Sequence, residues 1–335
     1  MTQKTENAKK GPSSLVAAIP HLVGFEPESS LVLVAIAKSS YRVQLVIRLD
    51  LIGQTDSDLL EKVNQSITSA QKEAGADIFL PVFYIGGDWQ KYRGFLKDFY
   101  QTEPEAIELL DAVWVNQNRY GSILCENQEC CPAEGYQLPD QTSLEKLQLI
   151  SQGKAVMPSR GNIESYFQSK AANKKLTLAL SKILKASKRS KSPSFQENLY
   201  NRVLVNLMQS DHELNLQEQA EVLFATGEVG LRDRLISEVL SEIQSQTEPL
   251  DKLHKLKARL LPAIQSAPEG QAKTILTCLG LWLWQLGESV WAEAAIKQAL
   301  EHDESYRLGI LALSAMKSGL PPWRFADCFI PTTSQ

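Results

Sequence analysis

The hydrophobic pattern of this 335-residue chain changes class before its middle. Up to Cys125, runs rich in Val, Ile and Leu alternate with segments whose apolar residues recur at helical spacing. Beyond Thr142 the spacing is helical and predicts no strand. The change predicts a mixed α/β domain followed by an all-α domain of helical hairpins, since one hydrophobic core rarely serves a chain of this length.

Domain boundaries are expected where pattern and composition change. Residues 1–14 are polar and lysine-bearing, and we expect a flexible tail there. The mixed α/β domain is expected at 15–160 and the helical domain at 161–322, followed by a C-terminal tail at 323–335. Both folded parts have lengths that are common for single domains.

The first domain is predicted to begin with a β-hairpin. Ser30–Asp50 contains two strand-like runs separated by a polar turn, and residues 56–74 have helical spacing with Asp56 available as the cap. Residues 77–85 form an apolar strand in which Pro81 favours an edge position or a bulge. The remaining elements expected here are helices at 89–100 and 104–110 and a strand–turn–strand unit at 112–125.

The second domain is predicted as helices joined by short loops, which suits antiparallel stacking. Near its end, Ala294, Ala295 and Ala299 lie beside Trp291 at helical spacing, which resembles half of a tetratricopeptide-type hairpin. A second copy at a period of about 34 residues is not found, so a helical bundle rich in small residues is the simpler interpretation. The expected helices are 142–152, 162–188, 195–209, 216–226, 231–244, 249–265, 271–287, 290–301 and 305–319.

Three of the five cysteines lie within seven residues, directly after the last expected strand. We call residues 125–135 the cysteine knuckle. Cys125, Cys130 and Cys131 could hold zinc, which thiolates bind well and which structural sites surround with four ligands. His21, a carboxylate or a second protomer would have to complete the set. The sequence predicts no other cofactor.

Other roles of these thiols stay open. The simplest interpretation is that they pack as small hydrophobic side chains inside the knuckle, because free cysteine is among the most buried residue types. Pro132 suits the first position of a short helical turn ended by Gly135. Cys131 would then be an N-cap, where backbone N–H groups lower a thiol pKa. A disulfide would join Cys125 to Cys130 or Cys131, because adjacent Cα atoms are only about 3.8 Å apart.

A candidate anion site precedes the helical domain. Ser159 is a plausible N-cap, and Arg160 could bind a phosphate or carboxylate beside exposed N–H groups, although ordinary capping is the simpler interpretation. An enzyme would gather Arg119, Cys131, Ser159 and Arg160 where the sheet meets the first helices. The sequence identifies no general base for it, and a catalytic thiol normally needs one.

The segment Lys170–Lys191, here called the basic strip, carries eight basic residues and no acidic one. Leu176, Leu180, Ile183 and Leu184 form an apolar face on the same helix. The strip could contact nucleic acid or an acidic membrane surface. A connecting helix that packs its leucines and solvates its lysines is the simpler interpretation, because no aromatic residue is interleaved for base stacking.

Composition limits the functional class. The net charge of -4 excludes a general attraction to nucleic acid or anionic lipid. No apolar run approaches the length that crosses a bilayer, the N-terminal stretch is a poor signal peptide and the cysteine count is odd. We therefore expect a cytoplasmic protein in a reducing compartment.

Several segments match known family signatures in the same order. They are IPHLVGFEPESSLVLV (19–34), NRYGSILCENQECCPAEG (118–135), GKAVMPSRGNI (153–163), GLRDRL (230–235) and the stretch 281–322. Together they resemble the domain-of-unknown-function family 4192, found mainly in actinobacteria. The resemblance implies a cytoplasmic bacterial protein with an α/β front and a helical back. A lysine-rich helix after Ser169, and Tyr120 where a tryptophan is common, depart from the family pattern.

We therefore expect a binding or regulatory module with a structural cysteine knuckle, whose helical domain is suited to protein partners. The alternative is an enzyme with a thiol- or metal-dependent site at the junction of sheet and helices.

Overall fold

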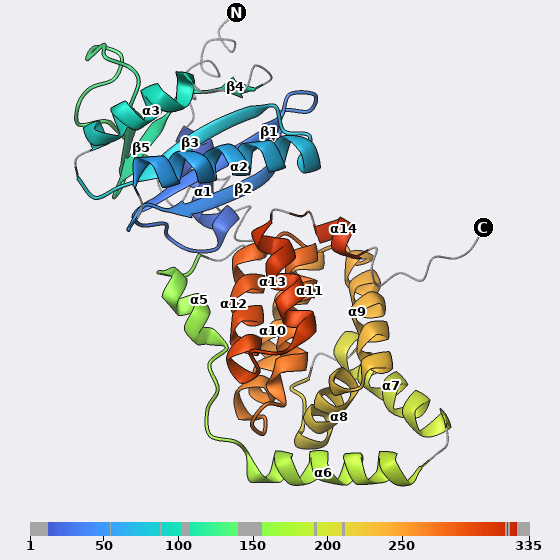
Figure 1. The fold of residues 1–335 in the computed structure, drawn as a ribbon. Coiled ribbons are helices and arrows are strands. Elements are labelled where there is room, and N and C mark those ends of the chain that lie inside the picture. The colour runs from blue at the N-terminus through green and yellow to red at the C-terminus, as the bar shows by residue number, and fades with distance from the viewer. Residues whose placement is uncertain are drawn as a thin grey trace, which may run out of the picture. The chain divides into compact units, whose positions relative to one another are not determined.

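The computed structural model describes residues 13–326, except 54, 88, 102–106, 140–155, 191–192, 210–211, 319 and 321. The chain divides into two compact units between Val156 and Met157, a few residues before the boundary expected from the pattern. The first unit holds a mixed sheet with helices and the second is helical (Figure 1). This confirms the predicted fold class. The expected helix at 142–152 and most of both expected tails lie outside the described residues.

Seven strands of the described chain form one sheet with the order β2-β1-β3-β5-β6-β7, and β4 also pairs with β3. β3 runs parallel to β4 and β5, whereas the other pairs are antiparallel. The strands are β1 (Ser30–Ala37), β2 (Arg42–Asp50), β3 (Ile78–Tyr84), β4 (Glu108–Leu109), β5 (Val113–Asn116), β6 (Arg119–Ser122) and β7 (Tyr136–Gln137). The predicted hairpin and the predicted strand–turn–strand unit are both present.

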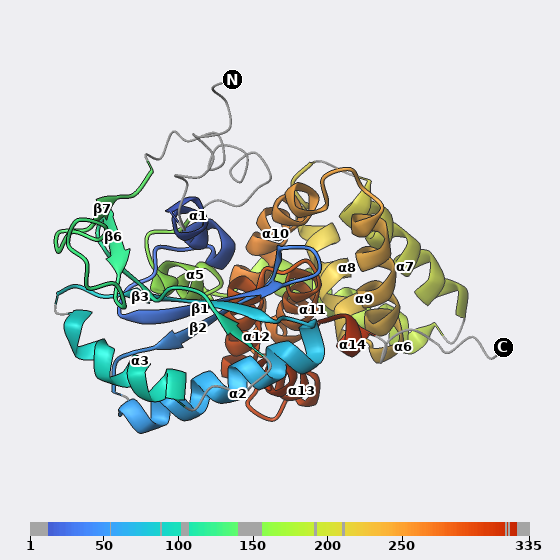
Figure 2. The same ribbon diagram turned by 90° about the horizontal axis from the view of Figure 1, so that it is seen from above.

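Helices cover both faces of this sheet (Figure 2). α2 (Asp56–Ala74), η2 (Trp89–Lys91) and α3 (Tyr92–Gln101) pack over one face, and α1 (Ser13–Val23) over the other. The main core lies under α2 and α3, where apolar side chains of both helices meet alternate residues of β1 and β3. Thr55 caps α2 in place of the predicted Asp56, because its side chain accepts a hydrogen bond from the Asp58 N–H.

Pro81 lies inside the sheet, so its predicted edge position is wrong. The Leu110 N–H donates to the Phe79 carbonyl, and the Ile85 N–H donates to Val115. Alternate residues of a strand turn their backbone groups to the same side. The nitrogen of Pro81 therefore faces the interval between β4 and β5, where the ladder is interrupted and a missing N–H loses little.

The helix expected at 104–110 is also wrong where the chain is described. Glu108–Leu109 is a short strand, because the Glu108 N–H donates to Asp77 and the Leu110 N–H to Phe79 along the open side of β3. Pairing with a distant strand overrides the local helical spacing.

Every described element from Arg160 onward is a helix. The helices are α5 (Arg160–Tyr166), α6 (Lys174–Arg189), α7 (Pro193–Met208), α8 (Leu216–Gly227), α9 (Val229–Gln244), α10 (Pro249–Ser266), α11 (Ala272–Gln285), α12 (Ser289–His302), α13 (Arg307–Lys317) and α14 (Pro322–Ala326). α14 therefore occupies the start of the expected C-terminal tail. Within the described ranges, no helix has both the length and the apolar character needed to span a bilayer.

The single helix expected at 162–188 is divided into α5 and α6. The N–H groups of Lys170 and Asn173 donate to the carbonyls of Gln265 and Ser266 at the end of α10. Asn173 then caps α6 with its side chain. Contacts with a distant helix therefore break a segment whose own spacing is continuous.

α11 and α12 form a close hairpin. A Cβ on Gly280 would lie 2.6 Å from Cγ1 of Ile296, so the glycine lets the two helices approach closely. The small residues Ala294, Ala295 and Ala299 are buried in this hairpin. A tetratricopeptide-like repeat stays a prediction.

Candidate functional site

The three cysteines of the knuckle converge at the β6–β7 side of the sheet. Their Sγ atoms all lie within 4.8 Å of one another, and those of Cys130 and Cys131 are 3.9 Å apart. Two thiolates at about 2.3 Å from one tetrahedral zinc ion would be about 3.8 Å apart. The spacing therefore fits ligation of a single soft metal ion.

The start of the knuckle is set by Ser122 at the end of β6. Its hydroxyl accepts hydrogen bonds from the N–H groups of Leu124 and Cys125 and donates to Asp111 at 2.6 Å. The hydroxyl thereby ends the strand and holds the backbone of Cys125. Partial burial raises the pKa of Asp111.

Two turns, in place of the predicted short helix, carry the rest of the knuckle. The Asn127 carbonyl accepts from the N–H groups of Cys130 and Cys131 at 3.1 and 2.7 Å, and the Gly135 N–H donates to Pro132 at 2.8 Å. Gly135 has a φ of 70°, which closes the second turn and returns the chain to β7. Cys131 is therefore not a helix N-cap.

Hydrogen bonding and burial separate the acidities of Cys125 and Cys131. Hydrogen bonds with the Cys131 thiol and with the backbone of Asn127 lower the pKa of Cys125, whereas partial burial raises the pKa of Cys131 to about 12. The sequence had indicated Cys131 as the acidic thiol. The structure assigns that property to Cys125, because the helix terminus on which the prediction rested does not form.

Arg119 and Tyr136 bind the backbone of the knuckle. Arg119 donates from Nε to the Glu134 carbonyl at 2.6 Å and from Nη2 to the Gly135 carbonyl at 2.9 Å. The Tyr136 hydroxyl donates to the Cys130 carbonyl. Arg119 thus holds the turn, and its proposed contact with a ligand stays a prediction. Tyr136 was missed, although an aromatic residue directly after the turn glycine was a usable signal.

Trp114 and Arg93 support the knuckle from beneath. A Cβ on Gly135 would lie 2.5 Å from the Trp114 ring, so only glycine allows the loop to rest there. Trp114 stacks on Trp89 with ring centroids 5.8 Å apart. Arg93 lies over Trp89 and donates to the Ile123 carbonyl at 3.1 Å. The sulfurs are therefore positioned by a packed and hydrogen-bonded base.

Among the described residues, no fourth His, Cys, Asp or Glu joins the three sulfurs. His21, considered as a fourth ligand, belongs to α1 and is not part of the group. A metal ion held by the three thiolates would keep a coordination position for an outside ligand. Structural zinc sites are closed by four protein ligands, and the described part of the chain supplies three at this point.

The candidate anion site formed by Ser159 and Arg160 belongs to the helical unit. Ser159 caps α5 by accepting from the Asn162 N–H. Arg160 pairs with Glu164 at 3.1 Å and with Glu293 of α12 at 2.9 Å. An anion at Arg160 would compete with these carboxylates. A ligand site using Arg119, Cys131, Ser159 and Arg160 together stays a prediction.

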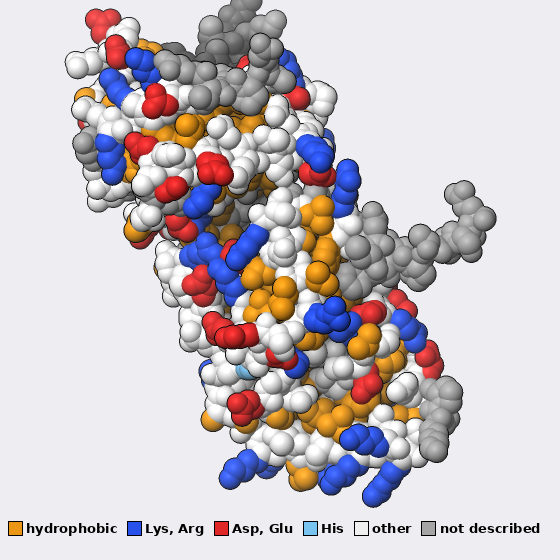
Figure 3. Space-filling model, in the orientation of Figure 1, with side chains coloured by type: hydrophobic (Ala, Val, Ile, Leu, Met, Phe, Trp, Pro, Cys, Tyr) orange, Lys and Arg blue, Asp and Glu red, His pale blue; other side chains and the backbone are white. Residues whose placement is uncertain are grey.

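Most of the basic strip forms α6, and Lys191 lies outside the described residues. Leu176, Leu180 and Ile183 are buried where α6 packs against α8, whereas Leu184 of the predicted apolar face is exposed. The lysines of α6 are exposed, and Figure 3 shows basic side chains along this edge of the helical unit. The apolar face is thus used in packing, and binding of acidic partners by the lysines stays a prediction.

The fold and the knuckle define a protein in which a sheet unit with three converging thiols precedes a stack of helices. The chain matches the family described as Domain of unknown function (DUF4192) over residues 12–323 and belongs to that family, as its signatures indicated. Comparison with curated proteins and with solved structures found no match.

Proposed function

We propose that this protein is a binding and regulatory module that captures a thiophilic metal ion, zinc foremost, at its cysteine knuckle. The observation that carries the proposal is the convergence of three sulfur atoms within 4.8 Å of one another. Three thiolates favour soft or borderline ions over magnesium or calcium, which prefer oxygen ligands.

The build of the knuckle favours reversible binding over a purely structural ion. The sheet unit has a core of its own under α2 and α3, and the knuckle is held by turns, Arg119 and Tyr136. The ion would therefore not be needed for folding. Cys130 is exposed and the other two thiols are half-buried, so an ion can enter from solvent.

An enzyme with Cys125 as nucleophile is the second candidate. The lowered pKa of Cys125 favours this role, because the thiolate is the reactive form of cysteine. Against it, no histidine in the described part of the chain belongs to the sulfur group, so a general base at the thiols is not identified.

Cadmium titration of the untagged protein under reducing conditions tests the metal proposal. We expect one ion per chain, seen by cadmium–thiolate absorption and by native mass spectrometry. Cys125→Ser, Cys130→Ser and Cys131→Ser should each weaken binding at least about tenfold, as loss of one ligand removes over 1.4 kcal/mol. Cys278→Ala is the control, because Cys278 is buried in α11 of the other unit.

Two results would contradict the proposal. One is stoichiometric cadmium binding that survives Cys125→Ser, and the other is the absence of any thiolate absorption in the folded protein. Rapid alkylation of Cys125 at neutral pH without metal binding would favour the enzyme.

A further inference from the structure

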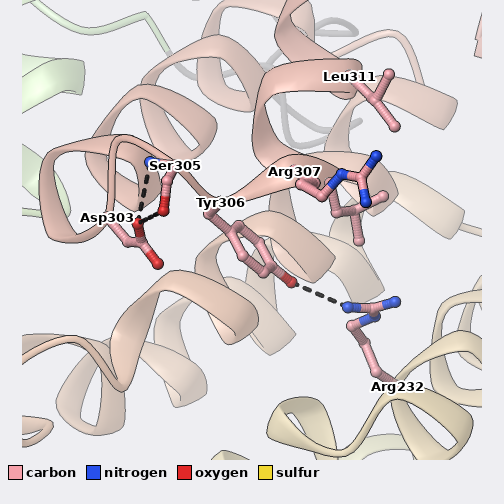
Figure 4. Close-up of a pocket in the computed structure, with 7 residues that line it drawn as sticks. Arg232, Asp303, Ser305, Tyr306, Arg307 and Leu311 are labelled. Atoms are coloured by element: carbon pink, nitrogen blue, oxygen red, sulfur yellow. Dashed lines mark hydrogen bonds between the residues drawn. The ribbon is translucent and has the colours of Figure 1, made fainter.

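A surface cavity of about 430 Å³ lies in the helical unit between α9 and the start of α13. Arg232 of α9 lines one side, and Tyr306 and Arg307 line the other. Figure 4 shows the Tyr306 hydroxyl directed toward the guanidinium group of Arg232, to which it is hydrogen-bonded. The volume lies within the range of cavities that hold organic ligands or side chains.

The acidic groups of this cavity are already paired. Asp303 accepts from Lys273 at 2.6 Å, and that bond holds the pKa of Asp303 at about 2. Asp233, next to the cavity, accepts two bonds from Arg232. Arg307 forms no ion pair with any residue that the structure describes. The cavity therefore has one cationic side chain in excess of its paired charges.

Two further groups at the cavity favour an anion, the Tyr306 hydroxyl and the N-terminal end of α13. Arg232 donates from Nη1 to the Tyr306 oxygen at 3.2 Å, which leaves the hydroxyl proton of Tyr306 available for a ligand. Tyr306 is also the N-cap of α13 and supplies no capping bond from its side chain. The first residues of α13 line the cavity, at the end of the helix where its dipole is positive.

Apolar side chains extend the cavity along α13. Leu308 and Leu311 line the cavity, and Leu311 is 60% exposed. Figure 3 shows hydrophobic side chains gathered over α13 and its neighbours, with basic groups at the border. A small inorganic anion would leave these side chains in water, whereas a peptide would cover them.

We propose that this cavity docks a protein segment in which a carboxylate lies next to a large aliphatic or aromatic side chain. The carboxylate binds Arg307 and the Tyr306 hydroxyl, and the apolar side chain packs on Leu311. The proposal is independent of the cysteine knuckle and of any metal ion.

Short fluorescein-labelled peptides with an Asp–Leu or Glu–Phe pair test this proposal by fluorescence anisotropy at low salt. We expect binding that weakens as salt is added and that is lost when Asn–Leu or Asp–Ser replaces the pair. Arg307→Glu should lower the affinity at least about tenfold and Leu311→Ser about threefold. Arg189→Glu and Leu178→Ser, both exposed on α6, are the matched controls and should change nothing.

Other outcomes overturn the proposal. The absence of binding for every peptide at about 1 mM is one, since that is the weak end of specific recognition. Peptide affinity that is unchanged by Arg307→Glu is another. If inorganic phosphate binds in an Arg307-dependent way and the apolar residue of the peptide adds nothing, the cavity is a small-anion site. Circular dichroism of each variant confirms that the fold is retained.

Discussion

The sheet unit keeps its thiols at the surface, whereas the helical unit keeps the amine of Lys257 under two aromatic rings. The knuckle sulfurs are exposed or half-buried and converge on one point. Lys257 is only 6% exposed, and its Nζ lies 3.3 Å from the ring centroid of Trp291 and 5.4 Å from that of Tyr166.

The two arrangements have different consequences. The knuckle thiols are accessible to a ligand from solvent, so we expect substitutions there to alter ligand binding. A cation enclosed by rings has its interactions within the protein, so substitutions there should alter stability and its pH dependence. The predictions below separate these two cases, beginning with the largest effect.

Gly135→Ala should damage the knuckle most. The new Cβ would lie 2.5 Å from the Trp114 ring and from the Tyr120 carbonyl, at a φ of 70°. We expect a loss of at least about 3 kcal/mol of unfolding free energy in urea, together with loss of cadmium binding. Gly53→Ala is the control, because Gly53 has a φ of 74° with open space around it and should lose only about 1 kcal/mol. Equal losses would show that Trp114 can move aside.

Lys257→Met should change how stability depends on pH. Burial lowers the pKa of Lys257 from 10.5 to about 8, so between these values the unfolded chain holds a proton that the folded chain has lost. Unfolding free energy therefore rises with pH across this window, by about 3 kcal/mol in total.

Urea denaturation followed by circular dichroism at several pH values tests whether the unfolding free energy rises with pH. The wild type should gain about 3 kcal/mol relative to Lys257→Met between pH 8 and 10.5. Subtracting the two curves removes the groups that both proteins share, such as Tyr200, whose raised pKa acts in the opposite direction. Lys255→Met, on the same helix and largely exposed, should give a curve parallel to that of the wild type. Parallel curves for Lys257→Met would contradict the assignment.

Arg119→Met should loosen the knuckle without unfolding the sheet. It removes two hydrogen bonds to the carbonyls of Glu134 and Gly135, and we expect a loss of about 1–2 kcal/mol with weaker cadmium binding. Arg42→Met, at an exposed position of β2, should stay within about 0.5 kcal/mol of the wild type. Unchanged cadmium affinity in Arg119→Met would mean that the thiols do not depend on this turn.

The smallest effect is expected on α6. Lys182→Glu with Lys185→Glu should alter stability by no more than about 0.5 kcal/mol, because both side chains are exposed. Because Leu176, Leu180 and Ile183 are buried, any binding of the lysines to DNA or phosphatidylserine vesicles should be electrostatic and should vanish as salt rises. Tight binding at physiological salt would show a second interaction surface.

Local patterns were sufficient to predict the hairpin, α2 and the change from sheet to helices, because alternation and helical spacing depend on nearby residues. They gave wrong elements where contacts with residues distant in the sequence determine the local structure. β4 forms because β3 offers hydrogen bonds, Pro81 is accepted where the ladder is interrupted, and α5 ends at contacts with α10.

The candidate site shows the same limit. The close spacing of Cys125, Cys130 and Cys131 predicted a sulfur cluster, and their atoms do converge. The difference in pKa between Cys125 and Cys131 depends on the hydrogen bonds of Cys125 and on the burial of Cys131, and both follow from turns that end at Gly135 and rest on Trp114. The sequence pattern contains no local signal for that three-dimensional support.

The indole of Trp114 lies directly against the loop that carries the sulfurs, since Gly121 and Gly135 leave no side chain between them. Its emission should therefore respond when the loop tightens or loosens. Trp114 is thus placed to act as an intrinsic optical reporter of the packing of the knuckle, without any attached dye.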